Sequence, residues 1–103
     1  MIYELRIYRF HQGRKDIFLK NFKIARTFMK KYGVTFVAGW ETLDRADEFV
    51  WIRKFPSSKH RQKAIDAYYR SPEWNKIVGH IRPTIKRREV RLLKVLPGSK
   101  LKK

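Results

Sequence analysis

The sequence predicts an α+β fold in which helices cover one face of a four-stranded antiparallel sheet. Short stretches of alternating apolar and polar residues, typical of strands, are interrupted by stretches whose apolar residues recur every three or four positions, typical of helices. Their order is β-α-β-β-α-(α)-β. This order is typical of a ferredoxin-like sandwich, in which the helices form one layer and the sheet the other.

The first third of the chain supplies one strand and one helix. Residues 2–10 alternate in polarity, which predicts a strand, and Gly13 follows in a turn. From Asp16 the period changes to that of a helix, and Gly33 is suited to ending it. The apolar face of this helix is expected to consist of Phe18, Phe22, Ala25, Met29 and Tyr32.

The rest of the chain supplies the other three strands and two helices. Strands are predicted at residues 34–43, 49–55 and 87–96. The helix between the last two has Ala64, Ile65, Tyr68 and Tyr69 on its apolar face. A shorter helix is expected to begin at Ser71-Pro72, because serine is a favoured N-cap and proline a favoured first helical residue.

The chain of 103 residues predicts a single domain, over residues 1–97, followed by a disordered basic tail, residues 98–103. It contains no cysteine, which excludes a disulfide scaffold and a thiol nucleophile. It shows neither a signal-peptide pattern nor an apolar run long enough to span a membrane, so we expect a cytoplasmic protein.

The charge is strongly positive, with 26 lysines and arginines against 9 acidic residues and a net charge of +17. Such a charge suggests nucleic-acid binding, which is one alternative function. The basic residues occur in every segment rather than in one stripe. We therefore expect only weak, sequence-independent binding to nucleic acid, lost near physiological salt.

The alternation in the strands divides their side chains between the two faces of the sheet. The compact set Tyr3, Leu5, Ile7, Val50 and Ile52 is expected to pack under the helices. The opposite set is expected on the uncovered face, where a second copy would cover it in a two-fold dimer. It comprises Glu4, Arg6, Tyr8, Phe10, Phe36, Trp40, Phe49, Trp51, Arg53 and Phe55.

Several short stretches follow one another in a recognisable order: residues 2–8, Gly13, and residues 32–33, 37–42, 71–74, 81–83 and 91–93. Taken together they resemble the NIPSNAP family of the dimeric α/β-barrel superfamily, and the resemblance spans roughly residues 2–96. It implies a homodimer whose two sheets enclose a barrel-like cavity. The superfamily also contains monooxygenases, haem-degrading enzymes and small-molecule-binding proteins. The family's third strand tends to carry His or Tyr and then Trp, where this chain has Trp51 and Arg53.

The candidate ligand-binding residues are the polar and aromatic side chains expected at this cavity: Glu4, Arg6, Tyr8, Trp40, Trp51, Arg53 and His80. Arg6 and Arg53 should converge, because they lie on neighbouring strands and share a face. One carboxylate, Glu4, neutralises only part of their charge, which favours a flat anionic ligand beside the aromatic rings. The alternative is a structural ion pair among packed aromatic residues.

The leading function is therefore an uncharacterised homodimeric small-molecule-binding protein. A cofactor-independent or haem-dependent monooxygenase is the alternative that the resemblance implies, with His80 as its base or haem ligand. We expect no cofactor and no metal, because the three histidines share no metal-ligand spacing. The motifs of P-loop, Rossmann and serine-hydrolase sites do not occur.

Overall fold

The computed structural model describes residues 1–99 and contains one four-stranded sheet, three α-helices and two short 3₁₀ turns. The strands are β1 (Ile2–Phe10), β2 (Thr35–Glu41), β3 (Glu48–Phe55) and β4 (Ile85–Leu93). The helices are α1 (Lys15–Met29), α2 (Ser58–Arg70) and α3 (Pro72–Ile81). The 3₁₀ turns are Lys30–Tyr32, after α1, and Arg82–Thr84, after α3.

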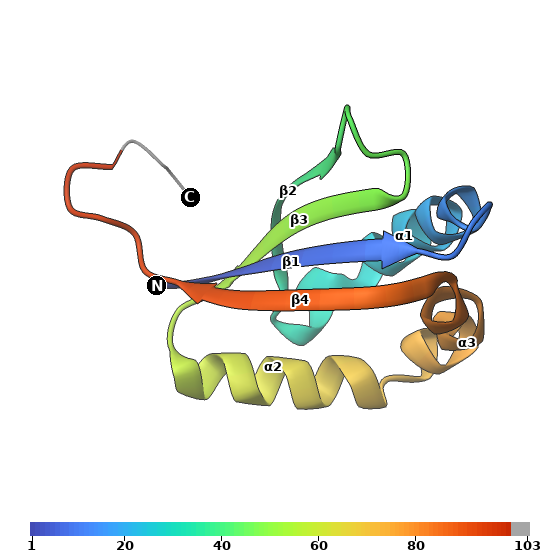
Figure 1. The fold of residues 1–103 in the computed structure, drawn as a ribbon. Helices are drawn as coiled ribbons and strands as arrows, with labels where there is room; N and C mark the ends of the chain where they lie inside the picture. The colour runs from blue at the N-terminus through green and yellow to red at the C-terminus, as the bar shows by residue number, and fades with distance from the viewer. Residues whose placement is uncertain (100–103) are drawn as a thin grey trace.

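All neighbouring strands are antiparallel, and their order across the sheet is β2-β3-β1-β4. The helices lie on one side of the sheet (Figure 1). The expected α+β, ferredoxin-like fold is therefore confirmed. The pairing of β1 with β3 places Glu4 opposite Arg53 and Arg6 opposite Trp51 in the middle of the sheet.

The helix ends are those that the sequence indicates. Ser71 is the N-cap of α3, and its Oγ accepts a hydrogen bond of 3.1 Å from the backbone N–H of Trp74. Gly33 ends the 3₁₀ turn after α1 with a φ of +87°, a left-handed conformation that suits glycine. The strand limits differ from the prediction by up to three residues, because β4 already begins at Ile85 and ends at Leu93.

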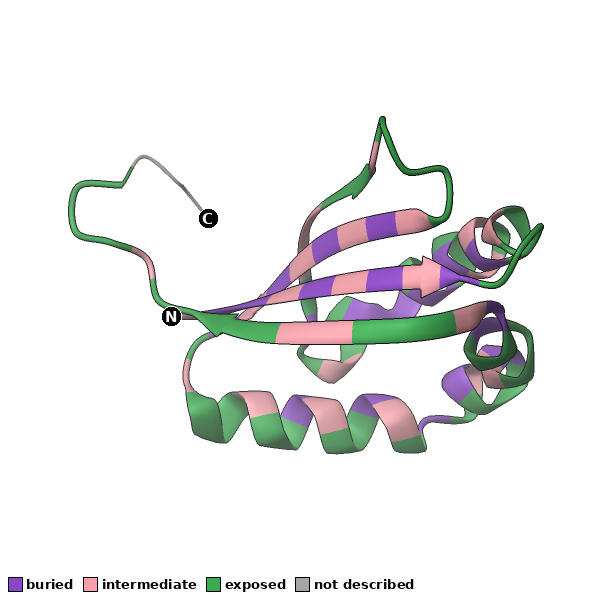
Figure 2. Ribbon diagram, viewed as in Figure 1, coloured by how far each residue is buried: buried purple, intermediate pink, exposed green. Residues whose placement is uncertain are grey.

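The two faces of the sheet are the reverse of what the sequence analysis expected. Figure 2 shows β1 and β3 alternating between buried and partly exposed residues. The aromatic and charged set packs under the helices, and the compact set faces away from them. The buried members are Glu4, Arg6, Tyr8, Phe10, Phe49, Trp51, Arg53 and Phe55. Large rings fill the deep space between sheet and helices and bury more apolar area there than small side chains would.

The side of the sheet away from the helices is called the open face below. Its centre consists of Leu5, Ile7, Val50 and Ile52, which pair across β1 and β3. All four are only partly buried. These residues, rather than Trp51 and its neighbours, are the ones that a second copy could cover.

An irregularity in strand β2 places Phe36 and Trp40 on opposite faces of the sheet, although strict alternation predicts that they share one face. Its register against β3 shifts between Phe36 and Ala38, so one extra residue is accommodated as a bulge. Phe36 therefore faces the helices, where its ring stacks on Trp51 with 6.0 Å between centroids. Trp40 pairs with Val50 on the open face and remains 50% exposed.

The turn after α1 is joined to α3 by a polar cluster. The Tyr32 hydroxyl donates a 2.5 Å hydrogen bond to one oxygen of Glu73, and Lys31 Nζ donates a 2.8 Å bond to the other. The bond from Lys31, followed by that from Tyr32, lowers the pKa of Glu73 from an ordinary value of 4.5 to about 2. The ionised carboxylate thus holds two elements together that are far apart in sequence.

We expect Glu73→Gln to lower the free energy of unfolding at pH 7, and the difference from wild type to shrink in acid. The folded pKa is below the unfolded one. The stabilisation from Glu73 is therefore complete well above pH 4.5 and is lost as the pH falls from there towards 2. Urea unfolding of both proteins at pH 7 and pH 3 measures the change. A difference that is the same at both pH values would contradict this account.

Within residues 1–99, no helix is long and apolar enough to cross a membrane. The predicted disordered tail begins at Gly98, and its residues 100–103 lie outside the part of the chain that the structure describes. Tyr3, on the open face, is 4% exposed. It lines a pocket together with Leu93, Lys94, Val95 and Ser99, so the segment after β4 lies against this end of the sheet.

Candidate functional site

Three arginines converge on one buried carboxylate, Glu4, which is 0% exposed at the centre of β1. Arg6 Nη1 lies 2.5 Å and Arg53 Nη2 2.7 Å from the same oxygen, Glu4 Oε2. Arg61 Nε, from the first turns of α2, reaches Glu4 Oε1 at 2.7 Å. Strands β1 and β3 and helix α2 therefore all contribute to this group, which is called the arginine cluster below.

The arginine cluster carries more positive than negative charge. No other carboxylate of residues 1–99 forms an ion pair with these three arginines. Arg6 and Arg53 are both buried, so solvent compensates their charge poorly, whereas Arg61 is partly exposed. A buried charge without a partner is costly, and an anion bound beside these guanidinium groups would remove that cost.

Two tyrosine hydroxyls accept further hydrogen bonds from Arg6 and Arg53. Arg6 Nε donates to the Tyr8 hydroxyl at 2.8 Å, and Arg53 Nη1 donates to the Tyr69 hydroxyl at 3.1 Å. Arg53 also lies 5.4 Å from the centre of the Trp51 ring, within the range of a cation–π interaction. Both arginines are thus held by aromatic residues rather than by further acids.

The charge state of Glu4 follows from these neighbours. Burial by itself raises the pKa of the Glu4 carboxyl. The positive charge of Arg53 and the hydrogen bonds from Arg61 and Arg6 outweigh burial and hold the pKa below its ordinary value. Glu4 is therefore ionised at neutral pH and serves as an acceptor for the arginines, not as a proton donor.

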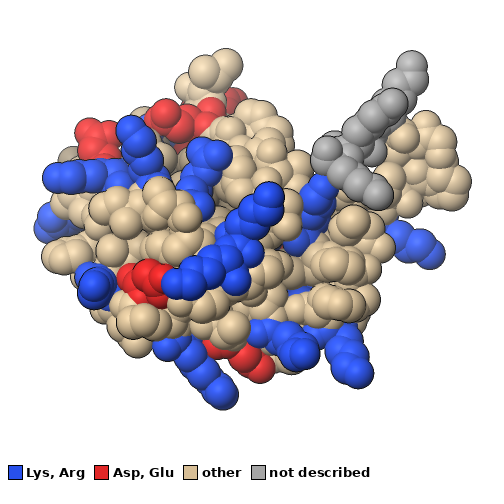
Figure 3. All heavy atoms as spheres, turned by 180° about the vertical axis from the view of Figure 1, so that it is seen from behind, with Lys and Arg blue, Asp and Glu red and all other residues tan. Residues whose placement is uncertain are grey.

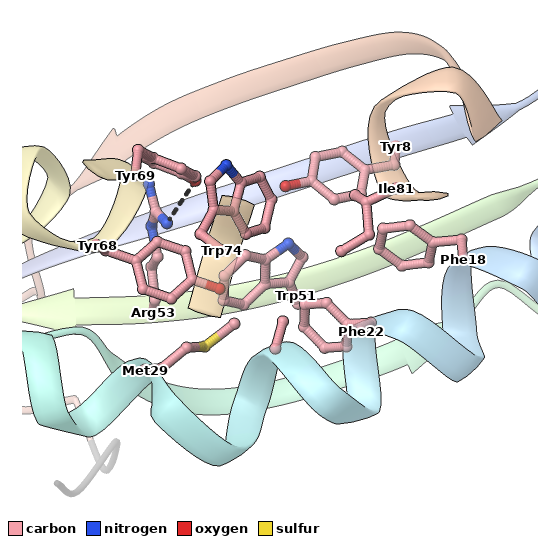
Figure 4. A pocket seen from close by; sticks show the side chains of 11 residues that line it. Tyr8, Phe18, Phe22, Met29, Trp51, Arg53, Tyr68, Tyr69, Trp74 and Ile81 are labelled. Atoms are coloured by element: carbon pink, nitrogen blue, oxygen red, sulfur yellow. Dashed lines mark hydrogen bonds between the residues drawn. The ribbon is translucent and has the colours of Figure 1, made fainter. Parts of the chain in front are cut away.

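A small cavity lies beside the arginine cluster, between the sheet and the helices. In Figure 4, aromatic side chains from both layers surround it, with Arg53 at one end. Its volume is about 20 Å³, which is room for about one water molecule. The aromatic residues of its wall include Tyr8, Phe18, Phe22, Trp51, Tyr68 and Trp74.

Tyr69 closes this cavity towards solvent. Among the cavity-lining residues of the described chain, it alone is partly exposed, whereas the others are buried. Its ring packs edge-on against Trp74, at 5.0 Å between centroids, and its hydroxyl accepts the hydrogen bond from Arg53 that Figure 4 draws as a dashed line. Tyr69 is therefore the least buried part of the wall and lies directly against Arg53.

Five of the seven candidate residues lie together: Glu4, Arg6 and Arg53 in the arginine cluster, with Tyr8 and Trp51 beside it. The expected convergence of Arg6 and Arg53 near Tyr8 and Trp51 is observed, although beneath the helices rather than on the uncovered face of the sheet. Trp40 is not part of this group, because the bulge in β2 turns it to the open face.

His80 is also not part of this group. It is exposed near the end of α3 and does not line the cavity. None of the cavity-lining residues in the described chain is a histidine, and the wall of packed aromatic rings leaves no room for a macrocycle. These residues therefore do not fit haem. Within residues 1–99, no group of three or more His, Cys, Asp or Glu residues could hold a metal ion.

Arg61 and Tyr69, both in α2, belong to the site but were not predicted as site residues. A signal for Arg61 was present, because it precedes Ala64, Ile65 and Tyr68 by three, four and seven residues and thus shares their apolar face. A charged residue at such a position needs a buried partner. Glu4 could not be identified as that partner without knowing how α2 lies on the sheet.

The remaining basic residues do not form a single interface. Figure 3 shows lysines and arginines scattered over one face of the molecule, with acidic residues among them. Several are paired, as in the contact of Lys15 with Glu41 at 2.9 Å and of Arg91 with Glu89 at 3.1 Å. This dispersed pattern is not that of a groove built to follow a phosphate backbone.

Solved structures with the same fold include two groups of proteins. One is a NIPSNAP family protein with unknown function from Agrobacterium tumefaciens, which is 25% identical, with a TM-score of 0.88 over 99% of this chain and 94% of that one. An uncharacterized NIPSNAP domain protein from Burkholderia xenovorans is 19% identical, with a TM-score of 0.85 over 96% and 98%. The second group includes an antibiotic biosynthesis monooxygenase, 16% identical, with a TM-score of 0.71 over 94% and 100%. At that identity, the likeness shows the fold alone.

No curated protein sequence matches the chain. The family model of NIPSNAP matches residues 3–100, which is nearly the whole chain and includes every strand and helix of the sandwich. The chain belongs to the NIPSNAP family.

Proposed function

We propose that this chain is a cytoplasmic, homodimeric small-molecule-binding protein whose ligand is a flat anion. The observation that carries the proposal is the pair of buried arginines, Arg6 and Arg53, which share a single carboxylate beside a cavity walled by aromatic rings. A carboxylate of the ligand would take a charge-assisted hydrogen bond from Arg53. Its planar body would stack against the rings.

Ligand entry requires a change in the cavity. A typical ligand pocket measures roughly 300–1,000 Å³, whereas this cavity has about 20 Å³. Tyr69 is the least buried part of the cavity wall. Its hydroxyl accepts a hydrogen bond from Arg53 Nη1, the nitrogen that would donate to a bound anion. Binding of the anion therefore replaces the bond that keeps Tyr69 in place, and the ring can swing outwards to make room.

The open face supports the homodimer. Leu5, Ile7, Val50 and Ile52 form a continuous apolar centre, with half-exposed Trp40 next to Val50. Such a patch on a small domain marks an interface. The rim carries both signs of charge, including Arg9 and Glu48, which suits a two-fold contact in which each surface meets its own copy.

The experiment compares two probes and two variants by isothermal titration calorimetry. Naphthoate is flat and anionic, and naphthamide has nearly the same shape without the charge. We expect wild type to bind naphthoate in preference to naphthamide, and Arg53→Leu to weaken naphthoate binding at least tenfold, because hydrogen bonds to charged groups contribute about 1.5–3 kcal/mol. Arg70→Leu, at the exposed end of α2, removes the same charge outside the cavity and should bind like wild type.

Failure of wild type to bind naphthoate, together with an Arg53→Leu variant as stable as wild type or more so, would mean that the arginine cluster is only structural. Glu4 retains Arg6 and Arg61 in that variant, so folding is expected to survive. Native mass spectrometry of the gently purified protein would show what it carries. A small molecule supports the proposal, and nucleic-acid fragments in its place contradict it.

A further inference from the structure

Two polar groups in the cavity wall have no partner. The indole Nε1 of Trp51 and the hydroxyl of Tyr68 are both buried, and neither finds a hydrogen-bond partner among residues 1–99. Trp51 is 2% exposed and Tyr68 1%. Each such group costs about 1–3 kcal/mol when left unsatisfied, and native proteins leave few of them.

Both groups are directed at the interior of the cavity. In Figure 4, the indole nitrogen of Trp51 is directed towards Tyr8 and Ile81, and the Tyr68 hydroxyl towards the Trp51 ring. All four residues line the cavity. The other two tyrosine hydroxyls of the site, on Tyr8 and Tyr69, each accept from an arginine, so the unsatisfied pair is confined to one part of the wall.

We infer that Trp51 Nε1 and the Tyr68 hydroxyl form a subsite for a neutral acceptor oxygen, such as a ketone, carried by the same ligand whose anionic group binds Arg53. This inference rests on the proposed function and specifies its substrate class. An indole N–H can only donate, so the group that it recognises must be an acceptor. Tyr68 remains a neutral phenol near neutral pH, because burial raises its pKa above the ordinary value, and it can donate as well.

The chemical consequence is a ligand with two different polar groups on a flat body. Arg53 selects a negative charge, and the second subsite selects a neutral oxygen that needs no counter-ion. A ligand lacking that oxygen would leave the two donors buried and unpaired, so it should bind more weakly although its shape is the same.

The test uses positional isomers of fluorenone carboxylate, each paired with the fluorene carboxylate that lacks only the ketone oxygen. We expect wild type to bind one fluorenone acid about tenfold more tightly than its fluorene partner, the value of one good hydrogen bond. Trp51→Phe should abolish this preference and bind both acids like the fluorene compound. Tyr68→Phe should reduce the preference. Met29→Leu, in the same wall without a polar hydrogen, should keep it.

The outcomes separate the two proposals. If fluorene and fluorenone acids bind wild type equally, the subsite is wrong and the anion-binding function stands. If neither binds, the proposed function fails and this inference fails with it. Should Trp51→Phe not fold, Tyr68→Phe and a high-resolution crystal structure of unliganded wild type decide. We expect ordered water on Trp51 Nε1 there, and a dry cavity would overturn the inference.

Discussion

Glu4→Gln should be one of the most destabilising single substitutions in this protein, with an expected loss of about 3–5 kcal/mol in the free energy of unfolding. The amide has no charge to offset Arg6 and Arg53, which stay buried on either side of it. Small domains are stable by only about 5–15 kcal/mol, so the variant should be largely unfolded in mild urea.

Urea denaturation followed by circular dichroism measures this effect, with Asp66→Asn as its control. Asp66 accepts a hydrogen bond from Gln62 on the exposed side of α2, and such pairs contribute no more than about 0.5 kcal/mol. Because the pKa of Glu4 is lower when folded than when unfolded, its contribution is complete well above pH 4.5 and disappears as acid protonates it. A Glu4→Gln variant within about 1 kcal/mol of wild type would show that the arginines do not depend on this carboxylate.

Two substitutions at neighbouring positions of β3 should have different effects. Val50→Asp should dissociate the dimer, whereas Trp51→Asp should unfold the subunit. Val50 faces away from the helices, so an aspartate there is tolerated in a monomer but would be buried and unpaired between two sheets. We expect Val50→Asp to remain folded and to dissociate. Trp51 lies in the core, and Trp51→Asp should unfold the subunit itself.

Analytical ultracentrifugation and circular dichroism together read out both properties. Wild type should sediment at about twice the chain mass and Val50→Asp at the chain mass with an unchanged spectrum. Ala67→Asp, on the exposed side of α2, adds the same charge elsewhere and should stay dimeric. A wild type that is monomeric at micromolar concentration, or a Val50→Asp variant that stays dimeric, would contradict the open-face interface.

The element order could be predicted because its signals are local. The alternation in residues 2–10 and the cap at Ser71-Pro72 depend only on neighbouring residues, and both are reproduced in the structure. The faces could not be predicted the same way. Alternation predicts that Arg6 and Tyr8 share one face of the sheet. It does not predict which face the helices cover, because that depends on the volume that side chains must fill between the sheet and the helices.

The candidate site could be predicted only in part, because some of its residues are placed by local patterns and others by the packing of α2 on the sheet. Glu4 and Arg53 could be placed on the same face of two neighbouring strands, because they share a parity, and the register observed in the structure makes them direct neighbours. Arg61 and Tyr69 could not, because their positions depend on how α2 docks on the sheet. Trp40 was misplaced by one inserted residue, since a single register shift moves every later side chain to the other face.

That inserted residue also constrains how the chain can change in length. With the bulge between Phe36 and Ala38, one end of β2 contributes to the helix-covered core and the other to the open face. Deleting a single residue there would restore regular pairing. It would also move Phe36 to the open face or Trp40 to the helix-covered face. Insertions and deletions in this strand should therefore be far less acceptable than in the turn at residues 42–47, even though both segments lie at the surface.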